Sequence, residues 1–575
     1  MLLALALLAV LPYLNALRAG FTYDDGLLIR RNPLVTGGID PVGIFASMFG
    51  VQYRPLTPLT FAFNEALTPG NAAAFHAVNL VLHAGVTLLV FLVAKQLFRG
   101  TQIAATSAVL FALHPIHTEA VTSLVGRAEL LAAVFGLMAL ASAARRERAV
   151  TRRARLALLL ISVASFSAAL LSKESALTLL PLIPAFRVAC RREPLGRGLW
   201  NELLSLDWLP YAACTVVFLV LRWHVLSATA TPLILTPLYN PLAFVSWTAR
   251  MRSALGVLWD YFGLLNVPFV LAADYSYNQV PVVTSWIAPR FLAGLGLVVA
   301  AAWIVVRHPR PAVRFAALFP FVALSVTANV LFPIGTIKAE RLLYLPSVGW
   351  ALLAAYFFDR LFRNPRYRTA AASALCGLLA LFAARTWARN GDWQNDATLY
   401  LSMVRSAPYS AKAQYSLGVA LLEARHYDTA VRQFRRAFDI YADANTALAL
   451  GVTFDKKGAI DEAVSWYGAA LAITPQFPEA HTHLCAADVN SGRFEAAIAA
   501  CRRGLRYHPA DPALLKGLGV GLVGTGAVGK GTDVLRRALA LNVGDDELRA
   551  YLSSLPAEAA AVGTLAVRAA VAVGQ

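Results

Sequence analysis

The charged side chains that could take part in chemistry lie in short segments between long apolar stretches. Two adjacent carboxylates, Asp24 and Asp25, follow the first apolar stretch. Later segments supply five cations that are candidates to bind a phosphate: Arg54, Arg127, Lys173, Lys338 and Arg341. Arg and Lys bind phosphate strongly, and Arg adds bidentate geometry. A nearby carboxylate can deprotonate a hydroxyl, and cations can stabilise a departing phosphate. The set therefore fits group transfer from an anionic lipid such as a glycosyl polyprenyl phosphate, with Asp24 the favoured base and Asp25 supporting or sharing the role.

A second set of polar residues could shape a pocket for the sugar and the acceptor. It consists of His76, His114, His117, Glu119, Glu129, Glu174, Glu340 and Tyr344. Simpler explanations compete with this one. Asp24 and Asp25 could cap a helix end, and His76 could be a hydrogen-bonded residue inside a helix bundle. Lys173 and Glu174 could form a local ion pair. Function is favoured because five separate segments place ionisable groups at one level of the membrane, where such groups are costly.

The group of His114, His117 and Glu119 raises the question of a metal site. Pro115 interrupts helical spacing between the two histidines, and no third histidine is near. The five cysteines show no metal-ligand spacing. We therefore predict no metal and no cofactor, with the lipid-linked sugar as a co-substrate.

Apolar stretches of near bilayer length must position these side chains. Of the 575 residues, 58% are hydrophobic and 15% are charged. This favours a membrane protein, because soluble domains carry about a quarter charged residues. Eleven ranges are expected to cross the bilayer: 2–17, 75–97, 103–118, 128–144, 156–171, 175–190, 207–223, 291–306, 315–332, 345–360 and 369–385.

Arg-rich loops predict the orientation of these helices. The connections alternate correctly when the basic loops are cytoplasmic: 145–155, 187–200, 307–314 and 360–368. The N-terminus is then inside and the C-terminus outside. If the apolar range 251–273 crossed the membrane, the basic loop 307–314 would lie outside. We therefore assign 224–290 to the outer face, with 251–273 interfacial or re-entrant. The net charge of +18 then comes mostly from Arg residues in the cytoplasmic loops of a membrane protein, which argues against a nucleic-acid partner. Because Arg far outnumbers Lys, a GC-rich bacterial genome and hence the bacterial inner membrane are favoured.

The C-terminal part repeats every 33 or 34 residues. Small residues recur at Gly418, Gly451, Cys485 and Gly519, and larger ones recur at Phe434, Tyr467, Cys501 and Leu535. This period is typical of tetratricopeptide repeats, each a pair of antiparallel helices. Four repeats over 411–545 and a capping helix over 545–555 would form a solenoid with a concave surface for an exported peptide or protein. The alternative is a structural spacer.

Two cysteines occupy facing positions of the third repeat. Folding a hairpin at Ser491 and Gly492 brings Cys501 within one helical turn of Cys485. If the repeats lie outside the cytoplasm, a disulfide would persist. The alternative is two small buried thiols that pack as apolar residues.

Six motifs in order carry a resemblance: YDD at 23–25, YRPLT at 53–57, FHAVNLVLH at 75–83, HPIHTEAVTSLVGRAELLA at 114–132, LSKES at 171–175 and AERLLYLPSVG at 339–349. Together with the repeats, they resemble the TMTC proteins (transmembrane and tetratricopeptide repeat-containing). The match covers nearly the whole chain. That family is similar to the GT-C glycosyltransferases, close to protein O-mannosyltransferases. The resemblance implies an eleven-helix membrane domain, a polyprenyl-phosphate sugar donor with mannose favoured, transfer to hydroxyl groups of exported proteins, and a metal-independent inverting mechanism. It also places the catalytic carboxylate in the pair of Asp24 and Asp25.

The expected fold is all-α. We predict a GT-C-type transmembrane domain over 1–390, a linker over 391–410, periplasmic repeats with a capping helix over 411–555 and a tail over 556–575. Two rival interpretations are a non-enzymatic membrane-anchored scaffold for envelope assembly and a lipid-linked sugar transporter. The scaffold does not require many charges at one level, and the transporter predicts polar residues near mid-membrane and inverted repeats.

Overall fold

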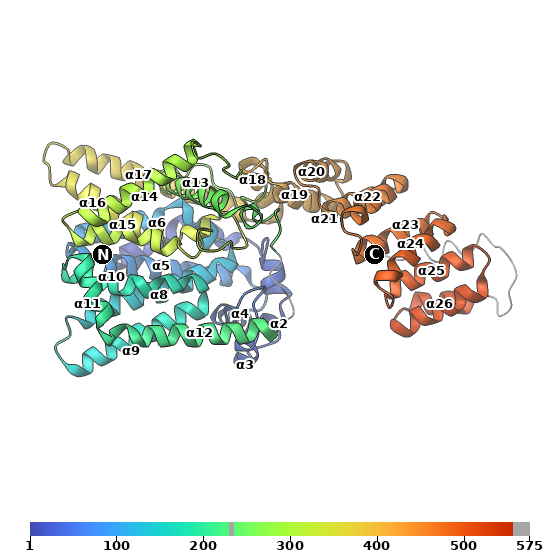
Figure 1. Ribbon diagram of the computed structural model, residues 1–575, viewed down its shortest axis with the longest axis horizontal. Coiled ribbons are helices and arrows are strands. Elements are labelled where there is room, and N and C mark those ends of the chain that lie inside the picture. The colour runs from blue at the N-terminus through green and yellow to red at the C-terminus, as the bar shows by residue number, and fades with distance from the viewer. Residues whose placement is uncertain (229–234, 556–575) are drawn as a thin grey trace. The chain divides into compact units, whose positions relative to one another are not determined.

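The computed structural model describes residues 1–228 and 235–555, so the predicted tail over 556–575 lies outside the described residues. The chain divides into two compact units, Met1–Ala407 and Pro408–Gln575. Every regular element in the described ranges is a helix, which confirms the all-α class (Figure 1). The range 391–410, expected to be a linker, contains η9 (Gly391–Trp393) and α18 (Asp396–Ser406), both in the first unit.

A helix lies in each of the eleven ranges that the sequence predicts to be apolar spans. They are α1 with η1 (Leu2–Val10, Leu11–Arg18), α5 (Ala72–Phe98), α6 (Thr101–Leu113), α8 (Arg127–Arg146), α9 (Arg152–Ser172), α10 (Leu179–Arg191), α12 (Leu209–Ala228), α14 (Pro289–Arg307), α15 (Pro311–Leu324), α16 (Ser347–Phe362) and α17 (Arg368–Asn390). By length and composition, six helices of the described chain can cross a membrane: those containing α5, α8, α9, α12, α14 and α17. The long helices α8, α9 and α12 run side by side in Figure 1.

Two helices end earlier than the apolar pattern predicts. The prediction carried the third span to residue 118, but α6 ends at Leu113 because His114 precedes a proline and adopts an extended backbone. The ninth span was expected to reach residue 332, whereas α15 ends at Leu324. In the turn that follows, Asn329 has a φ of 58° and its side chain bonds the backbone at Thr336 and Ile337. The backbone that follows α6 and α15 is therefore irregular where the prediction had helix, and polar residues lie in both of these segments.

An ion-pair network joins two of the basic loops at one end of the first unit. Arg187 on α10 contacts Glu202 at 2.9 Å and Asp207 at 2.7 Å. Arg146, at the end of α8, contacts Asp207 at 3.0 Å. The connection after α8 and the connection between α10 and α12 therefore lie together, as expected for loops on one side of a membrane. The connection between α10 and α12 contains α11 (Leu195–Leu204) and η6 (Leu206–Trp208).

The apolar range 251–273 forms α13 (Trp247–Asn266), which is not among the helices long and apolar enough to cross. It packs tightly on α14, because a Cβ atom on Gly294 would lie 1.9 Å from the Leu255 carbonyl oxygen. Its other end reaches the start of the segment before α16, where the Tyr261 hydroxyl accepts a hydrogen bond from the Ala339 N–H at 3.2 Å. A side chain of α13 thus satisfies a backbone N–H of the segment before α16.

Short helices fold the first long connection over the end of the bundle opposite the ion-pair network. They are η2 (Gly26–Arg30), α2 (Pro33–Thr36), α3 (Pro41–Phe45) and α4 (Leu56–Leu67). Two begin at a proline that follows a capping residue: the Asn32 side chain accepts from Leu34 N, and the Asp40 side chain accepts from Gly43 N. The remaining short elements of this unit are η3 (Pro115–His117), α7 (Thr118–Val121), η4 (Leu124–Gly126), η5 (Glu174–Thr178), η7 (Pro241–Phe244) and η8 (Glu340–Leu343).

The second unit is a series of antiparallel helix pairs ending in a single helix. Its helices are α19 (Ala411–Glu423), α20 (Tyr427–Ile440), α21 (Ala444–Lys456), α22 (Ile460–Ile473), α23 (Pro478–Asn490), α24 (Phe494–Tyr507), α25 (Pro512–Gly524), α26 (Val528–Leu541) and α27 (Asp546–Ser554). Each repeated small residue faces the large one of its own pair. A Cβ atom on Gly418 would lie 2.6 Å from the Phe434 ring, and one on Gly451 would lie 2.4 Å from the Tyr467 ring. Glycine is therefore required for these helices to approach.

A disulfide takes the place of that contact in the third repeat. Cys485 on α23 and Cys501 on α24 are bonded, with their Cα atoms 5.1 Å apart. Of the two alternatives open from the sequence, the structure has the bridge. It also contacts the next repeat, because a Cβ atom on Gly517 would lie 2.3 Å from the Cys485 sulfur.

We predict that replacing both bridged cysteines with alanine lowers the free energy of unfolding of the second unit by about 3 kcal/mol, since the bond closes a loop of 16 residues. Denaturant unfolding of the wild type and the variant measures the difference. Alkylation of intact protein before and after reduction, read by mass spectrometry, locates the bond. A further sample, unfolded in denaturant without reductant before alkylation, is the control, because every free thiol then reacts whatever its burial. Cys485 and Cys501 that react fully without reductant in protein purified from the cell envelope would contradict the bridge.

Candidate active site

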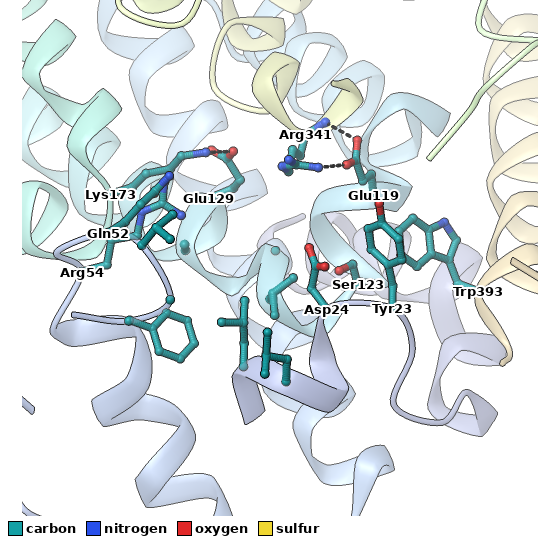
Figure 2. A pocket seen from close by; sticks show the side chains of 18 residues that line it. Tyr23, Asp24, Gln52, Arg54, Glu119, Ser123, Glu129, Lys173, Arg341 and Trp393 are labelled. Atoms are coloured by element: carbon teal, nitrogen blue, oxygen red, sulfur yellow. Dashed lines mark hydrogen bonds and ion pairs between the residues drawn. The ribbon is translucent and has the colours of Figure 1, made fainter. Parts of the chain in front are cut away.

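A polar cavity of about 340 Å³ opens at the end of the first unit that carries the first long connection (Figure 2). Six of the residues predicted from the sequence line it: Asp24, Arg54, Glu119, Glu129, Lys173 and Arg341. They come from connections that are far apart along the chain. The cavity lies at the start of α8 and the end of α9, whereas the basic ion-pair network lies at the other end of α8. The structure therefore gathers these side chains at one end of the helix bundle.

Each cation in the cavity has a carboxylate partner. Arg54 donates to Glu174 through Nε at 2.8 Å and Nη2 at 2.7 Å. Lys173 pairs with Glu129, and both side chains are almost fully buried. Although burial acts to raise it, Arg54 and Lys173 lower the pKa of Glu174 to about 2, so this carboxylate stays charged. These pairs hold their charges in fixed positions on one wall.

Arg341 forms the third pair and keeps part of its guanidinium free. Its backbone N–H donates to Glu119 at 2.8 Å, and its Nη1 bonds the other oxygen of the same carboxylate. Nε and Nη2 of Arg341 bond to no described residue, and the side chain is 38% exposed. That edge of a guanidinium is the one that binds phosphate in a bidentate manner. Arg341 is thus the cation of the cavity best placed to accept a new anion.

Asp24 and Asp25 are adjacent in sequence but have different surroundings. Asp24 is exposed and lines the cavity, and its side chain makes no hydrogen bond or ion pair with a described residue. Asp25 is fully buried and accepts hydrogen bonds from Thr22 N at 3.0 Å and Val125 N at 3.2 Å. Burial raises the pKa of Asp25 to about 7. Asp25 therefore holds the loop together, and Asp24 presents a carboxylate to the cavity, on the side of Arg341 in Figure 2.

The residue just before the two carboxylates, Tyr23, has an unusual backbone conformation. Tyr23 has a φ of 56°, in the left-handed region that a bulky side chain rarely adopts. Its N–H donates to the Asp396 carboxylate at 2.7 Å, which helps to hold this conformation. Burial lowers the pKa of the Arg341 guanidinium, but Glu119 and then Asp24 more than offset it and raise that pKa above its usual range. The electrostatic effect of Asp24 on Arg341 agrees with the orientation of the two side chains toward each other.

Arg127, a predicted phosphate ligand, does not line the cavity. Its side chain is fully buried and donates to Asn79 Oδ1 at 2.9 Å, Asn64 Oδ1 at 3.0 Å and the Phe75 carbonyl at 2.9 Å. The guanidinium also lies 4.3 Å from the centre of the Phe61 ring. Its donors are occupied by protein, so Arg127 holds α4, α5 and α8 together.

We predict that Arg127→Met lowers the thermal midpoint strongly, with a loss of about 3 kcal/mol or more, because it leaves several buried amide and carbonyl oxygens without donors. Thermal unfolding in detergent measures the effect. Arg18→Met, at an exposed arginine of η1, is the matched control and should unfold like the wild type. An Arg127→Met protein with the wild-type midpoint would show that the network does not carry stability.

Two of the predicted histidines, His114 and His117, form a buried cluster with His83, apart from the cavity. His83 contacts the Tyr344 hydroxyl at 2.7 Å through Nδ1, and His117 contacts the Ser347 hydroxyl at 2.8 Å through Nε2. His114 contacts the Leu265 carbonyl through Nε2 at 2.9 Å and accepts from Ile116 N through Nδ1. His76 is also buried. None of the predicted sugar-pocket residues His76, His114, His117 and Tyr344 lines the cavity.

Lys338 and Glu340 also lie away from the cavity. Lys338 lines a second pocket, where its Nζ is 3.6 Å from Asp260 and 4.2 Å from the centre of the Tyr275 ring. Glu340 is fully buried and accepts a hydrogen bond from the Tyr275 hydroxyl at 2.7 Å. The segment 338–341 thus places Lys338 in one pocket and Arg341 in the other, only three residues apart.

Several cavity residues were not predicted from the sequence. Tyr23, Gln52, Ser123 and Trp393 line it beside the charged groups. Three of them are next to, or within, the motifs that supplied the predicted residues. Trp393 follows α17, and no local pattern connects it to the first connection. Only the folded chain brings it there.

The fold and the cavity define a multi-pass helical membrane protein with a polar site at one end of its bundle and a C-terminal solenoid of helix pairs. Comparison with known proteins shows what the chain is similar to. The family model described as Tetratricopeptide repeat matches residues 456–519.

Over most of its length the chain is similar to proteins named protein O-mannosyl-transferases. It is 29% identical to one from Caenorhabditis elegans over 73% of this chain and 60% of the relative. It is 27% identical to human TMTC3 over 81% of this chain and 54% of the relative, and 30% identical to human TMTC1 over 77% and 56%. The chain thus spans a little over half the length of these relatives. The resemblance to the TMTC proteins predicted from the motifs is confirmed.

Two solved structures that are similar to this chain cover about a third of it or less. A crystal structure of MamA is 16% identical, covers 28% of this chain and 88% of its own, and has a TM-score of 0.25. YrrB, a TPR protein, is 16% identical, covers 34% of this chain and 98% of its own, and has a TM-score of 0.26.

Proposed function

We propose that the first unit is a glycosyltransferase that moves a sugar, with mannose favoured, from a polyprenyl phosphate to hydroxyl groups of exported proteins. The proposal rests on one observation above all: in a cavity whose cations are each paired, the exposed carboxylate of Asp24 has no side-chain partner among the residues that the structure describes. A carboxylate that is exposed in a cavity and not committed to a protein partner is available to take a proton from a substrate. The names of the similar proteins, which are protein O-mannosyl-transferases, support the same reaction class.

The proposed reaction is a single displacement. The Asp24 carboxylate removes the proton of the acceptor hydroxyl while the hydroxyl oxygen attacks the anomeric carbon of the sugar. The bond between that carbon and the phosphate oxygen breaks, and the electron pair leaves with the polyprenyl phosphate. Attack opposite the leaving group inverts the configuration. Asp24 ends protonated and returns its proton to water.

The leaving phosphate needs N–H donors that protein carboxylates do not already use. The free Nε and Nη2 edge of Arg341 supplies two. Lys173 has three N–H donors, and its contact with Glu129 uses one of them. Donors fixed before the reaction stabilise developing charge most effectively. We therefore assign the phosphate to Arg341, Lys173 and Arg54, and we leave Arg127 and Lys338 out of this role.

The second unit would hold the acceptor protein. Tetratricopeptide solenoids present a concave surface to a peptide or partner. The proposed orientation places the cavity and the repeats in the periplasm and the basic ion-pair network in the cytoplasm of a bacterial inner membrane. A disulfide in the third repeat agrees with a compartment where thiols oxidise.

We predict that Asp24→Asn reduces sugar transfer by about 10²–10⁴-fold without lowering stability, because the Asp24 side chain has no partner to lose. Asp25→Asn is the comparison. The two carboxylate oxygens of Asp25 accept one backbone N–H each. An asparagine has only one side-chain oxygen, so its NH₂ group would face one of these N–H groups. This variant should therefore unfold at a lower temperature. The assay follows a radiolabelled sugar from its polyprenyl phosphate to a Ser/Thr-rich peptide in lipid nanodiscs. Full activity in the purified Asp24→Asn, Asp25→Asn double variant would show that neither carboxylate is the general base.

A further prediction concerns lipid-phosphate affinity. Arg341→Ala and Lys173→Ala should each weaken binding of a polyprenyl-phosphate analogue about ten- to hundred-fold, since one charged hydrogen bond contributes roughly 1.5–3 kcal/mol. Lys338→Ala changes a buried cation of the neighbouring pocket and should leave the affinity unchanged. Titration of each purified variant measures the dissociation constant. If Lys338→Ala weakened binding while Arg341→Ala and Lys173→Ala did not, the assignment of the phosphate to this cavity would be wrong.

A further inference from the structure

The second helices of three repeats carry a pair of arginines at one equivalent position. Directly after the large repeated residue stand Arg435 and Arg436 on α20, Arg502 and Arg503 on α24, and Arg536 and Arg537 on α26. All of these arginines are exposed. The C-terminal halves of α22, α24 and α26, which are residues 467–473, 501–507 and 535–541, contain five arginines and no carboxylate. Positive charge is therefore concentrated at this end of the helices.

A row of exposed apolar side chains lies one helical turn beyond the arginines. Ile473, Tyr507 and Leu541 end α22, α24 and α26 at a spacing of 34 residues, and they are 43%, 45% and 49% exposed. Tyr507 follows Arg503 by four residues, and Leu541 follows Arg537 by four, so each pair shares a face of its helix. The helix dipole accounts for a cation near a helix end, but it does not account for the apolar row.

Contacts between repeats join the two rows into one surface. Nη2 of Arg537 donates to the Pro509 carbonyl at 3.3 Å, which places this arginine beside the end of α24. Nε2 of His508 lies 2.9 Å from the Gln476 carbonyl, just after the end of α22. The ends of the three helices thus lie side by side, and we call the surface over 471–473, 502–507 and 536–541 the basic edge.

Most guanidinium donors of the basic edge are available to a ligand. No hydrogen bond or ion pair joins the side chain of Arg502, Arg503 or Arg506 to another residue of the described chain. Arg536 lies 3.6 Å from Asp533. Each guanidinium carries five N–H donors in a geometry that matches a phosphate. The edge therefore suits a ligand with several phosphates.

The basic edge lies on the outer side of the stack. First helices of neighbouring pairs contact each other, α21 with α23 and α23 with α25, which places them on the inner side. By contrast, α22, α24 and α26 are the second helices of their pairs. A protein bound on the concave inner surface would therefore leave the basic edge free.

We infer that the basic edge binds an anionic bilayer surface, with its arginines at the lipid phosphates and its apolar row in the headgroup layer. Arginines beside exposed apolar side chains are typical of surfaces that lie at a membrane interface. An acidic polymer would engage the arginines but would leave the apolar row in water. The first unit has helices that can cross a membrane, so a bilayer is present at high local concentration. This inference does not depend on sugar transfer.

The test is flotation of the full-length protein, held in phosphatidylcholine nanodiscs, with added vesicles. We expect binding to vesicles that contain phosphatidylglycerol, loss of that binding at high salt, and no binding to vesicles of phosphatidylcholine alone. Arg502→Gln with Arg503→Gln should weaken binding about 25-fold, because each basic residue at an anionic surface contributes roughly 1 kcal/mol, a factor of about five. Unchanged thermal midpoints show that the variants fold.

Lys456→Gln with Lys530→Gln is the matched control, since it removes the same charge from exposed residues outside the basic edge. This variant should bind like the wild type. An equal loss in the two double variants would reduce the effect to overall charge and overturn the inference. A wild type that does not bind phosphatidylglycerol vesicles would overturn it as well.

Two measurements distinguish a lipid from an acidic protein. Tyr507→Ser and Leu541→Ser should each weaken vesicle binding several-fold and leave the binding of polyglutamate unchanged, because only a lipid interface takes up the apolar row. Benzoylphenylalanine in place of Tyr507 should crosslink to vesicle phosphatidylglycerol, and in place of Ala496, exposed at the other end of α24, it should not. Vesicle binding that survives both serine variants, or polyglutamate that binds more tightly than the vesicles, would make an acidic protein the partner and contradict the inference.

Discussion

The hydrogen bonds of the buried Arg127 guanidinium organise the end of the bundle on which the cavity depends. Arg127 binds Asn79 through Nε, and the amide nitrogen of Asn79 in turn donates to the carbonyls of Val121 and Ser123. The loop held in this way offers Val125 N to the Asp25 carboxylate. Asp25 fixes the turn from which Asp24 faces the cavity. A cation removed from water thus stabilises a path of contacts from α8 to the proposed base, and its own desolvation is offset by a full set of acceptors.

Pairing of charges explains how so many ionisable groups persist at one end of a membrane bundle. Unpaired charges are strongly disfavoured there, and the structure pairs Arg54 with Glu174, Lys173 with Glu129, and Arg341 with Glu119. The pairs orient the cations without using all of their donors. Asp24 is the exception, because it is exposed in the cavity and left without a partner. An arrangement with fixed cations and one free carboxylate supports transfer from a phosphate more readily than it supports anchoring or transport.

Periodicity and motifs were sufficient to predict the helical ranges and the repeats. Apolar length identified each helix of the bundle, and the 33- or 34-residue period brought Cys485 opposite Cys501. Helix ends were less predictable. The end of α6 follows from Pro115, but the end of α15 depends on Asn329, whose side chain bonds backbone several residues away.

The division of labour among similar residues could not be predicted, because it depends on tertiary position. Arg127 and Arg341 both occur in charged motifs, yet one is buried with its donors occupied and the other has a free edge. Asp24 and Asp25 differ because Asp25 is buried and accepts hydrogen bonds from Thr22 N and Val125 N, whereas Asp24 is exposed. Lys338 and Arg341 enter different pockets although only two residues separate them.

The most direct test of the account is an experimental structure of the Asp24→Asn protein in nanodiscs with a bound polyprenyl-phosphate sugar. The account predicts phosphate oxygens within hydrogen-bond distance of Arg341 Nε and Nη2, and the anomeric carbon facing residue 24 across a gap that admits a hydroxyl. A phosphate bound instead by Lys338 and Arg290 in the second pocket, with the sugar directed away from residue 24, would contradict it.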